Sequence, residues 1–354
     1  MDRADAMAEP SHQRIAGGAP TDVFRKLIAR DHWSGMANRA GSLQTRGMSL
    51  ARALLLRASR SQWLAEQFRR RAFARRAVRR FMPGEDVGAA LDAASTFATS
   101  GMGSIISSLG ERVNTAAEAE AVRQHYATVI DAIQARGLPA QLSVKLTHLG
   151  LDVDRERCAD SVLALCARAG AAGTMVWIDM EESHYVDATL ALYRRVRAEH
   201  ASVGVCLQAY LRRTPADLES LLAAGASIRL VKGAYREPPS VAYPRKADTD
   251  AAFHSLGGRM LEAATPDRPQ VFGTHDLALV ERVRSHAGLG GHPSDAWEVH
   301  MLYGIRSGDQ RALAASGVRV RVLISYGTHW FPWYVRRLAE RPANVWFVVR
   351  SLVS

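Results

Sequence analysis

Cysteine is scarce in this chain, and only Cys158, Cys166 and Cys206 occur. Their spacing fits neither a metal-binding pair nor a disulfide framework, which excludes the disulfide-rich and zinc-finger classes. No stretch of 18 consecutive apolar residues exists that could span a bilayer. The first residues mix acidic side chains with an arginine and lack the apolar core of a signal peptide. We therefore expect a cytoplasmic protein in a reducing environment.

Two catalytic motifs are missing as well. No glycine-rich loop of the G-x-G-x-x-G kind follows any apolar run, which counts against a dinucleotide-binding open sheet. No serine or cysteine stands in a nucleophile context such as G-x-S-x-G. Covalent catalysis by Ser183, Cys206 or Ser325 is therefore not expected.

Acidic residues are almost absent from residues 46–80, which hold eleven arginines and only Glu66 as an acid. This segment carries +10 of the formal net charge of +11, so the rest of the chain is nearly neutral. One interpretation is a helical cap whose arginines extend into solvent. Another is a patch that binds an anionic membrane. Nucleic-acid binding is not expected, because no reading motif accompanies the charge.

After residue 100, short apolar runs alternate with amphipathic segments, a pattern that predicts eight strands, each followed by a helix. The predicted strands are 104–109, 141–146, 174–179, 204–208, 228–231, 270–274, 297–302 and 318–324. The predicted helices are 115–136, 154–170, 185–200, 215–225, 248–264, 277–288, 309–316 and 330–341. This count is that of an α/β fold, a (βα)8 TIM-type barrel with additional N-terminal helices. A doubly wound open sheet is the alternative.

Three regions follow from this pattern. We expect residues 1–20 to form a disordered tail, because they are rich in alanine, glycine, proline and serine. Residues 21–100 are predicted to form an N-terminal helical cap segment. Residues 101–354 are predicted to form the catalytic barrel.

Polar side chains stand at the ends of five predicted strands, where a barrel places its chemistry. They are Lys145, Asp179, Gln208, Arg229, Lys232, Thr274 and His275. Cations outnumber acids, so this end of the barrel favours anions such as a diphosphate or a carboxylate. The two small residues after Lys232, Gly233 and Ala234, leave room for a ligand to approach the backbone.

A metal site is not expected at the same end. The candidate ligands are His148, Asp179, Glu181, His184, His275 and His300. Their spacing matches no standard ligand motif, and the many nearby cations oppose a hard metal ion.

A further anion-binding element is predicted near the C-terminus. There a buried strand is followed by a turn at residues 325–328 and by the last predicted helix, which Pro342 ends. Arg336 and Arg337 are adjacent in this helix, and Glu340 lies one turn later, close enough to hold one of them. Paired guanidinium groups bind a carboxylate or phosphate in a bidentate manner.

The sequence from about residue 81 to the C-terminus resembles the proline dehydrogenase family, in its monofunctional bacterial type. The motifs that carry the resemblance occur in the same order: RFMPGED, LGE, SVKLTHLGL, IDMEE, LQAYLRRT, RLVKGAYRE, THD, MLYGIR and RRLAERPAN. RLVKGAYRE together with RRLAERPAN is highly specific. The resemblance implies a (βα)8 enzyme that uses FAD to oxidise L-proline to Δ1-pyrroline-5-carboxylate by hydride transfer to flavin N5.

The resemblance also implies roles for residues at matching positions. It implies that Asp179 and Arg229 are catalytic. The implied substrate-binding residues are Lys145, Ala234, Tyr235, Leu302, Leu323, Arg336, Arg337 and Glu340. The implied FAD-binding residues are Met180, Gln208, Arg229, Lys232, Gly233, Ala234, Thr274 and His275. No metal is implied. The expected partners are a small amino acid and a quinone as electron acceptor, reached at the inner face of a membrane.

Three positions depart from the family pattern. Family members usually carry a tyrosine at position 323, a proline at 325 and a tyrosine at 333, where this chain has Leu323, Ser325 and Trp333. We expect Leu323 to flatten the pocket wall and to favour an unsubstituted or more apolar ring over hydroxyproline. Two alternatives follow: the same flavin chemistry on another cyclic amino acid, or an inactive barrel that acts as a binding protein.

Overall fold

The strands of this protein close into one parallel barrel. A computed structural model describes residues 78–331 and 334. The strands pair in chain order, and the last one returns to pair with the first. They are β1 Gly103–Ser108, β2 Ala140–Val144, β3 Val176–Ile178, β4 Val203–Gln208, β5 Ser227–Val231, β6 Gln270–Gly273, β7 Trp297–Leu302 and β8 Val320–Tyr326. The predicted (βα)8 barrel is confirmed, and the open sheet was the wrong alternative.

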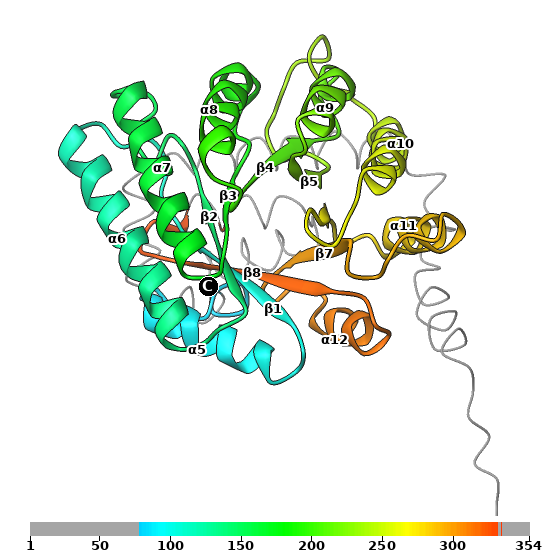
Figure 1. Cartoon of the computed structure of the whole chain (residues 1–354), viewed down its shortest axis with the longest axis horizontal. Helices are drawn as coiled ribbons and strands as arrows, with labels where there is room; N and C mark the ends of the chain where they lie inside the picture. The colour runs from blue at the N-terminus through cyan, green and yellow to red at the C-terminus, as the bar shows by residue number, and fades with distance from the viewer. Residues whose placement is uncertain (1–77, 332–333, 335–354) are drawn as a thin grey trace, which may run out of the picture. The chain divides into compact units, whose positions relative to one another are not determined.

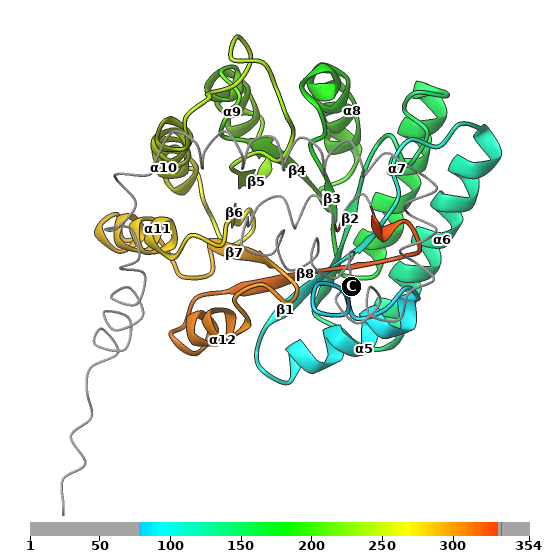
Figure 2. The same cartoon turned by 180° about the vertical axis from the view of Figure 1, so that it is seen from behind.

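The helices surround the strands in chain order, as Figures 1 and 2 show from opposite sides. They are α5 Val87–Ala98, α6 Ala116–Ala135, α7 Arg155–Ala171, the short 3-10 helix η2 Ser183–Tyr185, α8 Val186–Glu199, α9 Thr214–Ala223, α10 Lys246–Glu262, α11 Leu277–Leu289 and α12 Ser307–Ala315. Among the described residues, no helix is both long and apolar enough to cross a membrane.

Local sequence explains where several helices begin. The hydroxyl of Thr115 accepts a hydrogen bond from the backbone N–H of Glu118, and the Glu118 carboxylate accepts one from the N–H of Thr115, which forms a capping box at the start of α6. Asp154 caps α7 by accepting from two backbone N–H groups. Asp86 caps α5 in the same way through Ala89.

The junction of β8 with β1 corrects one prediction. The turn predicted to begin at Ser325 was wrong there, because Ser325 and Tyr326 are the last residues of β8. They pair with Ser107 and Ser108 of β1, and this long-range pairing extends the strand beyond its apolar run. α5 packs against both strands at this junction. The predicted tail, and the cap segment as far as residue 77, lie outside the described residues.

Ring contacts separate the two faces of the strands. The rings of Trp177 in β3 and His300 in β7 meet edge to face with centroids 5.7 Å apart. These strands are not neighbours in the barrel, so both side chains point into its interior. Alternation along a strand then places Asp179 and Leu302 on the interior side, two residues further on. The opposite face packs on the helices, as the contacts of Phe272 with Phe253 and with Trp297 illustrate.

Candidate active site

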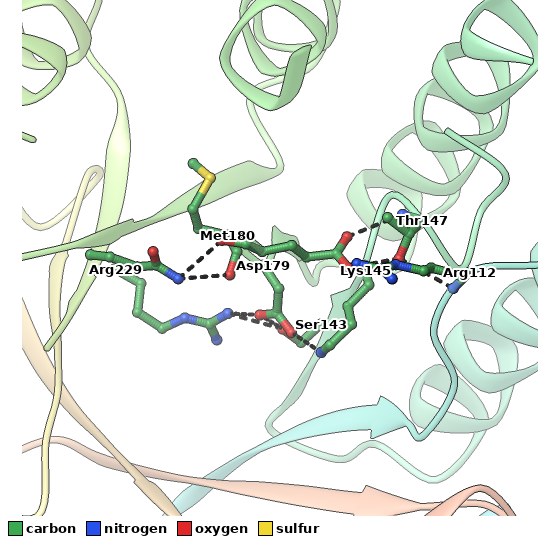
Figure 3. A network of polar contacts seen from close by, with 9 residues as sticks. Arg112, Ser143, Lys145, Thr147, Asp179, Met180 and Arg229 are labelled. Carbon is green, nitrogen blue, oxygen red and sulfur yellow. Dashed lines mark hydrogen bonds and ion pairs between the residues drawn. The ribbon is translucent and has the colours of Figure 1, made fainter. Parts of the chain in front are cut away.

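Asp179 is the centre of a polar cluster formed at the carboxyl ends of β2 and β3 and by Arg229 in the middle of β5 (Figure 3). Its Oδ1 accepts a hydrogen bond from the Ser143 hydroxyl at 2.7 Å, and its Oδ2 accepts one from Lys145 Nζ at 2.9 Å. Arg229 Nη2 donates to the same Oδ1 and also to the Ser143 oxygen at 3.0 Å. Figure 3 shows Lys145 and Arg229 reaching this carboxylate from opposite sides. The structure thus brings together three charged residues that the sequence analysis singled out on three different strands.

The charges of this cluster sustain one another. Burial on its own raises the pKa of Asp179, but Lys145 and Arg229 outweigh it and hold that pKa below its ordinary value of 3.8. Burial lowers the pKa of Lys145, but the carboxylate of Asp179 outweighs this effect and the pKa lies above 10.5. Two cations therefore face one anion at neutral pH. The positive excess suits a substrate that carries a carboxylate.

Gln208 and Arg229 each keep one buried polar atom without a hydrogen-bond partner among the described residues. The amide nitrogen of Gln208 donates to the backbone oxygens of Met180 and Glu181, at 3.2 and 3.3 Å, and so ties β4 to the segment after β3. Its Oε1 has no partner, and neither has Arg229 Nη1. Their side chains are 2% and 3% exposed. An unpaired acceptor and an unpaired donor in a buried site indicate a polar ligand with complementary groups.

The segment after β5 is fixed by the ion pairs of Lys232 and by the backbone conformation of Gly233. Lys232 Nζ lies 2.6 Å from Asp250 and 3.0 Å from Asp276, so this predicted cofactor-binding residue is paired with two carboxylates. Gly233 follows with φ of +122°, and a Cβ there would lie 2.3 Å from the ring of Tyr210. Only glycine fits this turn, which leads directly into Ala234 and Tyr235.

The opposite wall is apolar. Leu302 of β7 and Leu323 of β8 are register partners, and each side chain is half-buried. The predicted cofactor-binding pair Thr274 and His275 lies at the adjacent end of β6. His275 Nε2 accepts a hydrogen bond from the backbone N–H of Leu302 at 3.3 Å, which ties this segment to β7.

No group of three or more histidine, cysteine, aspartate or glutamate side chains is arranged for a metal ion within residues 78–331. His300, one of the candidate metal ligands considered in the sequence, is buried in the barrel. Its Nε2 lies 3.2 Å from Glu298 Oε2. Glu181 accepts two hydrogen bonds from Thr147, one from its backbone N–H and one from its hydroxyl.

Comparison with known proteins gives this site a family. The profile of the family described as Proline dehydrogenase matches residues 90–350, which is most of the chain. The chain belongs to the proline dehydrogenase family. The family predicted from the sequence motifs is therefore confirmed, and with it the class of enzyme.

Two curated members of the proline dehydrogenase family illustrate the relation. Proline dehydrogenase 1 of Bacillus subtilis subsp. natto is 35% identical over 283 residues, which cover 78% of this chain and 91% of that protein. Proline dehydrogenase of Deinococcus radiodurans is 36% identical over 281 residues, covering 78% and 89%.

A solved structure supports the same fold. The chain is similar to proline utilization A from Bdellovibrio bacteriovorus inactivated by N-propargylglycine, with a TM-score of 0.73 at 21% identity. The alignment covers 91% of this chain and 40% of that longer protein. At this identity the likeness concerns the barrel fold alone.

Four of the residues singled out for the proline dehydrogenase resemblance lie outside the described residues. They are Trp333, Arg336, Arg337 and Glu340. The carboxylate-binding role predicted for the two arginines stays a prediction.

Sequence reasoning missed two side chains of the cluster. Ser143 bonds to both Asp179 and Arg229, and its position two residues before Lys145 could have placed it on the same face of β2. Trp177 lies below Arg229, with the guanidinium carbon 5.2 Å from its ring centroid. In the sequence it appears only as one apolar residue of a buried strand, which carries no sign of the direction it faces.

Proposed function

We propose that this protein is an FAD-dependent proline dehydrogenase that oxidises L-proline to Δ1-pyrroline-5-carboxylate. The observation that carries the proposal is the cluster of Asp179 with Lys145 and Arg229. It lies toward the carboxyl ends of the strands, where (βα)8 barrel enzymes have their catalytic groups. A site with one more cation than anions fits a small amino acid whose carboxylate is negative.

The buried atoms of this site fit a flavin. The edge of an isoalloxazine ring carries an N–H donor between two carbonyl acceptors, beside the reactive nitrogen. The unpartnered Oε1 of Gln208 is available to accept from such a donor, and the unpartnered Nη1 of Arg229 is available to donate to an acceptor. We propose that these two hold the ring edge. Met180, Lys232, Gly233, Ala234, Thr274 and His275 are the further residues proposed to hold FAD.

When bound, FAD would supply the acceptor for the hydride that leaves proline. That hydride comes from the ring carbon that lies beside the nitrogen and does not carry the carboxylate. The protein's part is to bind, orient and stabilise. Lys145 and the predicted pair Arg336 and Arg337 hold the substrate carboxylate, which fixes the reacting carbon. Arg229 would supply a fixed positive charge that stabilises the negative charge of the flavin when it is reduced. The ring nitrogen of proline must be neutral to share its lone pair with the forming C=N bond, and it then releases its remaining proton.

The flavin spectrum of the purified protein tests the proposal. We expect bound FAD, identified by chromatography after denaturation, and loss of the flavin absorption band when L-proline is added without oxygen. D-proline should leave the band intact, because its carboxylate and ring cannot both take the productive position. o-Aminobenzaldehyde should trap the imine product.

The two alternatives give different results in the same experiment. Flavin that is reduced by pipecolate but not by proline would point to another cyclic amino acid. A protein that neither carries nor takes up FAD would point to a binding protein.

We also propose that a quinone accepts the electrons from the reduced protein. Δ1-pyrroline-5-carboxylate formation with a soluble quinone analogue, compared with formation with oxygen alone, measures this. Equal rates with and without the quinone would contradict it.

A further inference from the structure

Trp177 forms the floor below the guanidinium of Arg229. The two side chains are in cation–π distance, 5.2 Å from the guanidinium carbon to the ring centroid. Trp177 is 1% exposed and Arg229 is 3% exposed, so water does not separate them. The indole thus contacts the side chain that links Asp179 to the proposed flavin.

Three contacts fix the indole itself. Its Nε1–H donates to Gln141 Oε1 at 2.7 Å. The ring of His300 meets it edge to face across the barrel. Gly204 of β4 provides the space, since a Cβ there would lie 2.5 Å from a ring carbon of Trp177. The indole therefore has one available position.

The layer below is also immobilised, by ion pairs around Glu298. His300 is 3.2 Å from Glu298, which Arg319 and Arg321 hold at 2.7 Å each. Burial lowers the pKa of His300 to about 4, so its imidazole is neutral at physiological pH.

These contacts decide where the free donor of Arg229 can point. Nη2 is anchored by Asp179 Oδ1 and Ser143 Oγ, but these two acceptors lie only 2.7 Å from each other on one side of that nitrogen, so the plane of the guanidinium can still turn about them. A ring packed against the face of that plane does fix it. Without the indole, the guanidinium gains a cavity into which it can turn, and Nη1 loses its direction.

We propose that Trp177 is a positioning residue that orients Nη1 of Arg229, and through it sets how readily the bound flavin is reduced. The inference rests on the proposed function. It adds a residue that has no polar group in the site and lies one layer below it.

Two variants remove the support in independent ways. Trp177→Leu deletes the aromatic face, and Gly204→Ala displaces the indole without deleting it. In both we expect the flavin to become harder to reduce, by about tenfold in the equilibrium constant, or about 30 mV for a two-electron couple. We expect kcat for proline to fall about tenfold while KM changes less than about twofold, because the substrate carboxylate is held elsewhere. Trp177→Phe should recover part of the loss.

A second measurement tests the same support of Arg229 without a bound flavin. Cys206 is the register partner of Arg229 and is 4% exposed, and it lies on the same face of β4 as Gly204. When the guanidinium is free to turn, we expect alkylation of Cys206 by a thiol reagent to accelerate, measured by peptide mass spectrometry. Cys158 and Cys166 of α7, which lie away from this layer, serve as internal references.

Trp297→Leu is the matched control. This buried tryptophan of β7 faces Phe272 and the helices instead of the interior. We expect it to lower the melting temperature without changing the flavin potential or the Cys206 reactivity. Equal potential and equal Cys206 reactivity in wild type, Trp177→Leu and Gly204→Ala would overturn the inference. A wild-type protein that takes up no FAD would overturn the proposed function instead, while the Cys206 rates would still test the support of Arg229.

Discussion

Asp179 accepts hydrogen bonds from three side chains, and it is the only carboxylate that these interactions join to Lys145 and Arg229 within the described residues. Its side chain is 17% exposed. Removing its charge would leave two cations facing each other at short range. The residue is therefore expected to matter for both stability and catalysis.

We predict that Asp179→Asn lowers kcat/KM for proline about 100-fold and the free energy of unfolding by about 3 kcal/mol. The amide keeps the shape but presents an NH₂ group to donors. Steady-state kinetics and urea unfolding measure the two effects. The control is Asp131→Asn, which breaks an exposed pair with Arg168 and should leave the free energy of unfolding nearly unchanged, because solvent screens exposed pairs. Comparable losses in the two variants would contradict the prediction.

The depressed pKa of Asp179 also fixes a pH dependence. A carboxylate whose folded pKa lies below 3.8 contributes stability above that value, and the contribution disappears as pH falls through the folded pKa. The difference in unfolding free energy between wild type and Asp179→Asn should therefore be constant from pH 7 to about pH 5 and should shrink below about pH 4. Urea titrations at successive pH values measure it. A difference that grows in acid would show that the sign is wrong.

Leu323 carries the prediction about substrate choice. Together with Leu302 it forms an apolar wall, so we expect kcat/KM to be higher for proline and for pipecolate than for 4-hydroxyproline. Leu323→Tyr should reduce the space for the larger ring and lower kcat/KM for pipecolate relative to proline by about tenfold. Leu323→Phe separates the size of the ring from the effect of its hydroxyl. Preference of the wild type for hydroxyproline would refute the assignment.

At the scale of elements, the segment after β5 depends on one residue that sequence analysis could identify only as small. We predict that Gly233→Ala destabilises the protein by about 2 kcal/mol, because the strained φ and the contact with Tyr210 act together. FAD affinity should fall with it. The control is Gly288→Ala in α11, where an added Cβ meets no atom within 4 Å. This substitution should leave the free energy of unfolding unchanged or raise it. Thermal unfolding and FAD titration compare the two, and equal effects would contradict the assignment.

How far the sequence predicted each element depended on the range of the interaction that formed it. Strands and helices of the barrel followed from local periodicity, and the structure adds the caps that begin helices, such as Thr115 with Glu118. The end of β8 did not, because Ser325 and Tyr326 resemble a turn until Ser107 and Ser108 of β1 pair with them. Lys145 and Asp179 could be placed at strand ends, because a strand end depends on where the local apolar run stops. The face of the barrel to which the Trp177 side chain points could not be predicted. Buried parallel strands lack the alternation that would reveal it.

At the scale of the whole molecule, charge is distributed unevenly. Residues 46–80 carry +10 of the net +11, and they lie almost entirely outside the described residues. The proposed transfer of electrons to a quinone predicts that this segment binds a membrane, since quinones reside in membranes whose inner surface is anionic. Each basic residue near such a surface contributes about 1 kcal/mol of attraction.

We predict that the full chain co-sediments with vesicles that contain phosphatidylserine at low ionic strength, and that salt releases it as the Debye length falls from about 30 Å at 0.01 M to about 8 Å at 0.15 M. Vesicles of phosphatidylcholine alone should not retain it. Replacing Arg69, Arg70 and Arg71 by glutamine should shift release to lower salt while leaving proline-dependent flavin reduction unchanged, because these residues precede the matched barrel. Binding that is independent of salt, or equal for the two kinds of vesicle, would favour the other interpretation, in which the segment is a cap on the barrel and its charge serves only solvation.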